Sequence, residues 1–162
     1  MALPAHPVVI DNTTLSNFAL VGRADLVTGL WGERASTTSL VMNEYLAGVE
    51  GGILSPDIWD DLPLLELTED ESTFQAGLPS RLGAGEGSCL AVACRRQGIL
   101  VTDDKVARKE ARRVGTSVTG SVGVLVLCVR QGLLSLDEGN RLLESMIDHK
   151  YRSPVDKLDD LL

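Results

Sequence analysis

The sequence is poor in histidine, cysteine and aromatic residues, and each shortage excludes a class of protein or site. Its two histidines, His6 and His149, stand at opposite ends of the chain. The three cysteines, Cys89, Cys94 and Cys128, lack the paired spacing of zinc ligands or of a disulfide framework, which indicates reduced thiols. With only two Trp, two Tyr and two Phe, the core must be mostly Leu, Val, Ala and Ile, as is common where buried parallel strands meet helices.

The sequence also lacks long apolar runs. None approaches the roughly 20 residues that span a bilayer, and the N-terminus has no charged, hydrophobic, cleavable signal. We therefore expect a cytoplasmic protein with no membrane contact. The length of 162 residues favours one domain, residues 1–150, followed by a short acidic tail, residues 151–162. The net charge of −8 argues against a general nucleic-acid coat protein.

Short apolar runs alternate with helical patterns along the chain. We expect strands at 8–11, 35–38, 64–68, 99–102 and 116–119. We expect helices at 15–20, 23–30, 39–49 and 69–76, another between the glycine-rich segment 79–87 and Gly98, and three more at 105–114, 122–131 and 136–148. Residues 55–62 fit either a short helix or a loop. This alternation predicts a three-layer α/β/α domain with a central, mostly parallel sheet of about five strands.

Five acidic residues occupy positions where such folds bind ligands. Asp11 closes the first strand, and Asp103 with Asp104 follows the fourth, at the carboxyl edge of the predicted sheet. Glu44 lies within an amphipathic helix, and Glu86 opens another. Two like charges about 4 Å apart cost roughly 4 kcal/mol at the effective dielectric of a protein surface. Converging carboxylates would therefore raise their pKa values or bind a hard cation, and oxygen-only ligands favour Mg²⁺ or Mn²⁺ over zinc.

Together with neighbouring residues, these acids resemble a known family. Their order resembles the PIN-domain ribonucleases, and more closely a bacterial and archaeal branch with a Gly-Glu pair and an Asp-Asp-x-x-Ala-Arg run. Gly85-Glu86 fits the pair, and Asp103-Asp104-x-x-Ala107-Arg108 fits the run. The later run 118–125 fits as well, so the resemblance covers the chain from Val8 to about Asp148. Either Asp103 or Asp104 could fill the family's fourth acidic position, and the Thr-x-Asp spacing of other members favours Asp104.

The resemblance implies a metal-dependent endoribonuclease that hydrolyses RNA phosphodiester bonds, and it suggests the toxin of a toxin-antitoxin pair. Asp11, Glu86 and Asp104 would bind Mg²⁺ or Mn²⁺, while Glu44 and Asp103 would act through water or position the nucleophile. Thr13 or Thr102 would orient that water. Basic residues bracket the aspartate pair, and four of them would bind the RNA substrate: Lys105, Arg108, Lys109 and Arg112. The implied protein partner is an antitoxin, and the leucine-rich segments 23–30 and 44–49 predict a homodimer or a partner helix.

Other interpretations stay open at this point. Taken singly, Asp11 and Asp103 fit strand-ending turns, Glu86 fits a helix first turn favoured by the dipole, and Glu44 fits a solvated helix face. The basic cluster also fits a solvated helix face. The alternative function is a non-catalytic PIN-like module that binds nucleic acid or a partner. A receiver-like phosphoacceptor fits less well, because receivers place their acid pair after the first strand.

Overall fold

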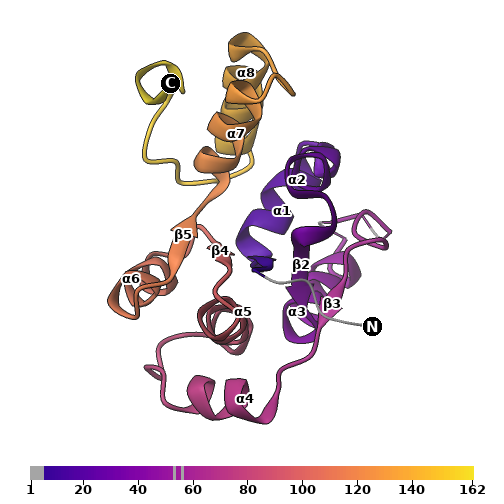
Figure 1. The fold of residues 1–162 in the computed structure, drawn as a ribbon. Coiled ribbons are helices and arrows are strands. Elements are labelled where there is room, and N and C mark those ends of the chain that lie inside the picture. The colour runs from indigo at the N-terminus through magenta and orange to yellow at the C-terminus, as the bar shows by residue number, and fades with distance from the viewer. Residues whose placement is uncertain (1–5, 53, 56) are drawn as a thin grey trace.

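The computed structural model describes residues 6–52, 54–55 and 57–162, and its centre is a five-stranded parallel sheet in the order β3-β2-β1-β4-β5 (Figure 1). The strands are β1 (Val8–Ile10), β2 (Ala35–Thr38), β3 (Leu64–Leu65), β4 (Ile99–Val101) and β5 (Ser117–Thr119). The expected α/β/α fold with its parallel sheet is confirmed. Because all five strands are parallel, their carboxyl ends lie at the same edge of the sheet. The residues that follow β1, β2 and β4 therefore lie close together.

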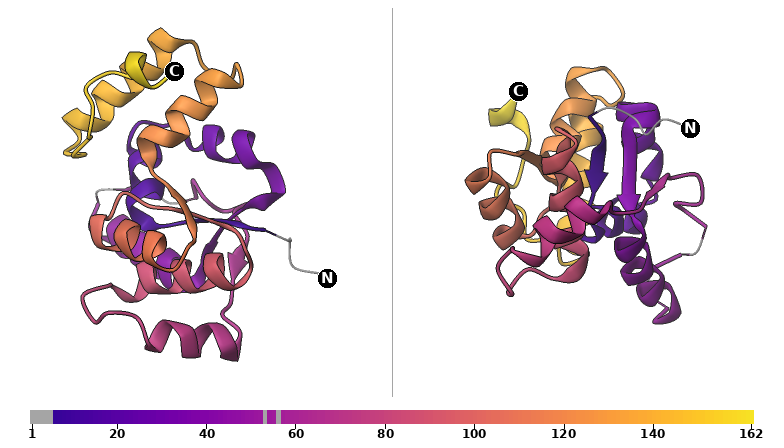
Figure 2. Two further views of the ribbon diagram at one scale, coloured as in Figure 1. Left: turned by 60° about the vertical axis from the view of Figure 1, so that its left-hand side comes forward. Right: turned by 60° about the horizontal axis from the view of Figure 1, so that its bottom comes forward.

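Helices cover both faces of the sheet (Figures 1 and 2). One face carries α1 (Asn12–Leu20), α2 (Ala24–Trp31), α7 (Ser121–Arg130) and α8 (Leu136–Asp148), and the other carries α3 (Ser39–Glu50), α4 (Glu69–Ala76), α5 (Ala84–Arg95) and α6 (Lys105–Arg113). Two 3-10 helices, η1 (Gly32–Arg34) and η2 (Asp159–Leu161), complete the regular structure of the described residues. The central strand β1 is fully buried, because it lies between β2 and β4 and α5 packs over it.

Several element boundaries differ from the expected ones. Helix α1 begins at Asn12, three residues earlier than expected, because the Asp11 side chain accepts the N–H of Asn12 and caps the helix; Thr38 caps α3 by accepting the N–H of Val41. β3 has two residues where five were expected, since its pairing with β2 covers only Leu64 and Leu65. The described part of segment 55–62 forms turns, with no helix.

Helix α5 begins within the glycine-rich segment, at Ala84, so that Gly85 and Gly87 are helical. A Cβ at Gly85 would collide with the Glu44 carboxylate, and a Cβ at Gly87 would lie in tight contact with Gln75, at 3.2 Å. The glycines therefore let α3 and α4 approach the start of α5 closely. Glu86 lies in the first turn of that helix, as expected.

The chain after α8 folds back onto the domain. Leu158 is fully buried beside Gly139, where an added Cβ would approach Leu158 Cδ1 to 2.9 Å. The backbone N–H of Leu158 donates to Asn140 Oδ1 (2.8 Å), and Arg130 donates to the carbonyl of Leu161 (2.9 Å). Figure 1 shows this segment beside α8. Within the described residues, no helix combines the length and apolarity that crossing a bilayer requires.

Candidate active site

Asp11 directly follows β1 and is the most deeply buried of the five candidate acids, with 1% of its surface exposed. Its Oδ1 accepts the backbone N–H of Asn12 (2.7 Å), and its Oδ2 accepts the hydroxyl of Thr102 (2.7 Å). Burial raises the pKa of Asp11 from 3.8 to about 7; the charges of Glu86 and Glu44 contribute to this rise, and the two hydrogen bonds oppose it. This carboxyl group is therefore poised to bind a proton or a cation near neutral pH.

Glu44 on α3 and Glu86 on α5 lie within electrostatic reach of Asp11 and of each other. The N–H of Gly85 donates to Glu44 Oε1 (3.1 Å), and a Cβ on Gly85 would lie 2.5 Å from that oxygen. Burial raises the pKa of Glu44, and the charge of Glu86 raises it further, against the Gly85 hydrogen bond. Glu86 folds back over the start of its own helix, because its Oε2 fills the space that a Cβ on Gly83 would need.

Two threonine hydroxyls connect Asp11 to the residues that follow β4. Thr102 donates to Asp11 and accepts the backbone N–H of Asp104 (3.1 Å). Thr13 donates to the same Asp11 oxygen (3.3 Å) and accepts the backbone N–H of Asp103 (3.0 Å). Asp104 uses its Oδ1 to cap α6. The two hydroxyls thus fix the strand ends β1 and β4 relative to each other.

Asp103 points to different partners from Asp104. Its Oδ1 accepts the backbone N–H of Ser121 (2.8 Å) and the hydroxyl of Tyr151 (3.2 Å). Its Oδ2 accepts Asn17 Nδ2 (3.1 Å), the Ser121 hydroxyl and the Thr14 hydroxyl (3.4 Å). Both Asp103 oxygens are therefore occupied by donors of the chain itself, whereas Asp104 Oδ2 makes no hydrogen bond to the described residues.

None of the five acids forms an ion pair with the residues that the structure describes. The ion pairs found there are Arg23–Asp25, Arg95–Asp70, Arg96–Glu71 and Arg113–Glu110. The mutual repulsion of Asp11, Glu44 and Glu86 is thus not balanced by a nearby basic side chain. Such a set of oxygen donors fits a hard divalent cation.

The side chains do not form a ready-made metal cage. Across residues 6–52, 54–55 and 57–162, no three Asp, Glu, His or Cys side chains stand close enough together to hold a metal ion. The expected convergence of five acids is therefore incomplete. Asp11, Glu44 and Glu86 approach one another, and the backbone of Asp104 is linked to Asp11 through Thr102. The side chain of Asp103 instead faces α1, α7 and the C-terminal segment.

Helix α6 carries the basic residues next to this group. Lys105, Lys109 and Arg112 are exposed on it. Arg108 is half-buried and donates to the carbonyl of Thr102 (3.1 Å). The guanidinium of Arg108 is thereby fixed against the turn that carries both aspartates.

In a comparison with protein-family models, the model described as a PIN domain matches residues 7–162. The chain belongs to the PIN-domain family. PIN domains are in general nucleases, so this domain has a nuclease-type fold and its expected chemistry is phosphodiester hydrolysis. Neither the curated proteins nor the solved structures gave a match.

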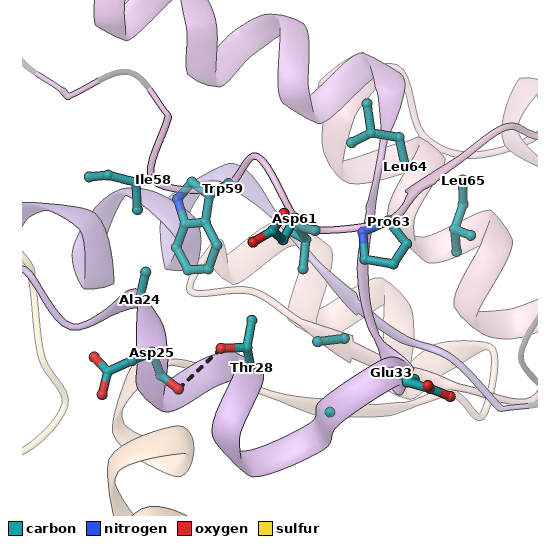
Figure 3. A pocket seen from close by; sticks show the side chains of 13 residues that line it. Ala24, Asp25, Thr28, Glu33, Ile58, Trp59, Asp61, Pro63, Leu64 and Leu65 are labelled. Atoms are coloured by element: carbon teal, nitrogen blue, oxygen red, sulfur yellow. Dashed lines mark hydrogen bonds between the residues drawn. The ribbon is translucent and has the colours of Figure 1, made fainter.

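A pocket of this PIN domain lies away from the acids. It has a volume of about 970 Å³, lies between α2, η1 and β3, and is lined by Trp59, Leu62 and Leu65 among others (Figure 3). None of the five candidate acids lines it. Its lining is mostly apolar and includes the separate carboxylates of Asp25, Glu33 and Asp61.

The sequence analysis did not identify three residues that contact Asp103: Asn17, Ser121 and Tyr151. Each donates a hydrogen bond to Asp103, from positions 86, 18 and 48 residues away. Ser121 lies in the run 118–125 that resembles the family, and that run was a usable signal. Nothing in the sequence around Asn17 or Tyr151 indicates the contact, because it depends on how α1 and the C-terminal segment pack.

The metal-free PIN domain is expected to lose stability as the pH rises from 5 to 8. The raised pKa of Asp11 means that the folded state holds a proton that the unfolded chain has released above pH 3.8. The free energy of unfolding therefore falls with rising pH until about pH 7, by at most about 3 kcal/mol. Urea unfolding in EDTA at both pH values measures the difference. Asp11→Asn should reduce it, and a wild-type domain that is more stable at pH 8 would contradict the electrostatic account.

Proposed function

We propose that this PIN domain is an endoribonuclease that depends on Mg²⁺ or Mn²⁺. The observation that carries the proposal is the buried carboxyl group of Asp11, which has no basic partner among the described residues and is repelled by Glu44 and Glu86. Binding a divalent cation would relieve that repulsion. The family assignment supports the same chemistry.

Asp11, Glu86 and Asp104 are the proposed ligands of the ion. When bound, the ion would lower the pKa of a water molecule and neutralise charge on the leaving oxygen. We expect loading to require rotation of Glu86, whose carboxylate now lies over Gly83, and of Asp104, which now caps α6. Thr102 holds the Asp11 carboxylate in a fixed orientation throughout.

Glu44 and Asp103 keep supporting roles in this proposal. Glu44 is held by the N–H of Gly85 and adds negative charge beside Asp11, where it would bind a water molecule and help to place the nucleophile. Asp103 fixes the turn after β4 through its contacts with α1 and α7.

RNA would approach along α6. Lys105, Lys109 and Arg112 are exposed on this helix, which starts at Asp104, and their charges suit a phosphate backbone. Arg108 lies closest to the acids, because it contacts the Thr102 carbonyl, and its guanidinium suits a phosphate at the cleavage site.

A toxin-antitoxin role extends the proposal, with an antitoxin or a second copy of the chain as protein partner. Of the two segments expected at such an interface, α2 buries Leu26 and Val27 in the core. Helix α3 exposes Leu40 and Leu46, at 40% and 45% of their surface. We therefore propose α3 as the partner-binding helix.

Purified protein should cleave RNA in the presence of Mg²⁺ or Mn²⁺ and lose that activity in excess EDTA. Single-stranded and structured RNAs and the matching DNA serve as substrates, and gel analysis of the products separates internal cuts from end trimming. Restoring Mn²⁺ after EDTA should restore cleavage. Cleavage that survives EDTA would contradict the metal requirement. No cleavage, together with no saturable Mn²⁺ binding in calorimetry, would favour the alternative of a non-catalytic PIN-like binding module.

A further inference from the structure

The chain after α8 returns to the candidate active site through Tyr151. Its hydroxyl donates to Asp103 Oδ1 at 3.2 Å, and its ring is half-buried. Burial raises the pKa of Tyr151, and the charge of Asp103 raises it further, so the hydroxyl is protonated and donates at neutral pH. The contact joins the last part of the chain to the turn that carries both aspartates.

Asp103 is the point at which three parts of the fold meet. Asn17 reaches it from α1, Ser121 from the start of α7, and Tyr151 from the segment after α8. A carboxylate bound by donors on both oxygens has a fixed orientation, and each charge-assisted hydrogen bond restricts it further. Tyr151 is the one donor among these that lies beyond α8.

Asp103 is also linked to the buried Asp11, through its own backbone N–H. The N–H of Asp103 donates to the Thr13 hydroxyl, which in turn donates to Asp11 Oδ2. A shift of Asp103 would therefore move the partner of Asp11. It would also move Asp104, the next residue, whose N–H bonds Thr102.

The C-terminal segment is anchored independently of Tyr151. Leu158 is fully buried, its N–H bonds Asn140, and the Leu161 carbonyl accepts from Arg130. These contacts on α7 and α8 hold residues 158–161 in place. Loss of the Tyr151 hydroxyl alone should therefore leave the segment docked and remove one contact with Asp103.

We propose that Tyr151 is a positioning residue of the nuclease site: it fixes Asp103, and through Asp103 the two acids Asp11 and Asp104. The segment after α8 is then part of the site. This inference rests on the proposed function. It adds to the site a residue that does not lie at a strand end, and it makes Asp103 the residue through which Tyr151 acts.

The test compares Tyr151→Phe with Tyr45→Phe, a matched control. Tyr45 is the other tyrosine of the chain, and its hydroxyl donates to the carbonyl of Ser55 (2.9 Å), away from Asp103. Tyr151→Phe is expected to lower kcat about tenfold and to weaken Mn²⁺ binding severalfold in calorimetry, with KM for RNA unchanged within twofold. Tyr45→Phe should change kcat and Mn²⁺ binding by less than twofold. Assays run well below the unfolding temperature of both variants.

A second variant tests whether the effect passes through Asp103. Asn17→Ala removes another donor of the same carboxylate and should also lower kcat and weaken Mn²⁺ binding, and the double variant with Tyr151→Phe should lose less than the product of the two single effects. The inference is overturned by an active wild type in which Tyr151→Phe behaves like Tyr45→Phe. Normal Mn²⁺ binding and cleavage by Asn17→Ala would overturn it equally. A wild type that neither cleaves RNA nor binds Mn²⁺ overturns the proposed function instead.

Discussion

Asp11→Asn is expected to reduce RNA cleavage at least a hundredfold. The substitution removes a charge from the buried position that is proposed to hold the divalent cation, and metal-assisted charge stabilisation contributes several kcal/mol to such reactions. An increase of about 1.4 kcal/mol in the activation free energy lowers the rate tenfold. Single-turnover cleavage at saturating Mn²⁺ measures the loss directly.

The same substitution should stabilise the metal-free domain at pH 8. Asparagine keeps the size of the side chain and can cap α1, while it removes the charge whose burial raises the pKa of Asp11 to about 7. Lost activity with unchanged or increased unfolding temperature in EDTA would separate a chemical effect from unfolding. Asp25→Asn is the matched control, because Asp25 is exposed, pairs with Arg23 and lies away from the acids. It should cleave like the wild type.

Two results would contradict this account of Asp11. Cleavage by Asp11→Asn within a few fold of the wild type would remove Asp11 from the site. A large loss of stability in EDTA at pH 8 would show that the Asp11 charge is balanced in the folded protein, against the electrostatic argument.

Glu71→Gln is expected to lower the free energy of unfolding by about 3 kcal/mol, the scale found when one partner of a buried ion pair is removed. Glu71 is 2% exposed and binds Arg96 through both carboxylate oxygens at 2.8 Å. It also accepts the N–H of Thr68 in the capping box that starts α4. Glutamine keeps the shape but turns one acceptor into a donor that faces the guanidinium. Chemical denaturation at pH 7 measures the loss.

The effect of Glu71→Gln should disappear in acid. Burial alone would raise the pKa of Glu71, but the hydrogen bonds from Arg96 and Thr68 outweigh burial and lower it below 4.5. The ionised side chain therefore stabilises the fold above about pH 4.5, and this contribution is lost as the pH falls through the lowered pKa. Glu69→Gln, an exposed neighbour on the same helix, is the control and should stay within about 0.5 kcal/mol of the wild type. An equally small change for Glu71→Gln would contradict the assigned role of the pair.

The sheet could be predicted because each strand is a short apolar run bounded by clear stop signals. Val8–Ile10 ends at Asp11, and Ile99–Val101 starts after Gly98 and ends before the aspartates. Parallel pairing then brings these strand ends to one edge, which is why local sequence was enough to group Asp11 with Asp103 and Asp104. The edge strand β3 was the exception: its pairing with β2 stops after two residues, and no local signal shows where.

The orientation of the acids could not be predicted, because it is set by contacts between distant segments. Asp103 and Asp104 are adjacent in sequence, yet one is fixed by Asn17 and Tyr151 and the other caps α6. The glycines of segment 79–87 are a further case. The helix was expected to follow this segment, but α5 begins within it, at Ala84, and the N–H of Gly85 donates to the distant Glu44 carboxylate.

The most direct measurement of the central claim is anomalous diffraction from crystals of the protein soaked in Mn²⁺, compared with crystals of Asp11→Asn. The account predicts a manganese peak bound by Asp11 in the wild type, with Glu86 or Asp104 as a further ligand, and no peak there in the variant. A wild-type structure at full Mn²⁺ exposure with no peak beside Asp11, or with the ion bound at acids elsewhere on the surface, would contradict it.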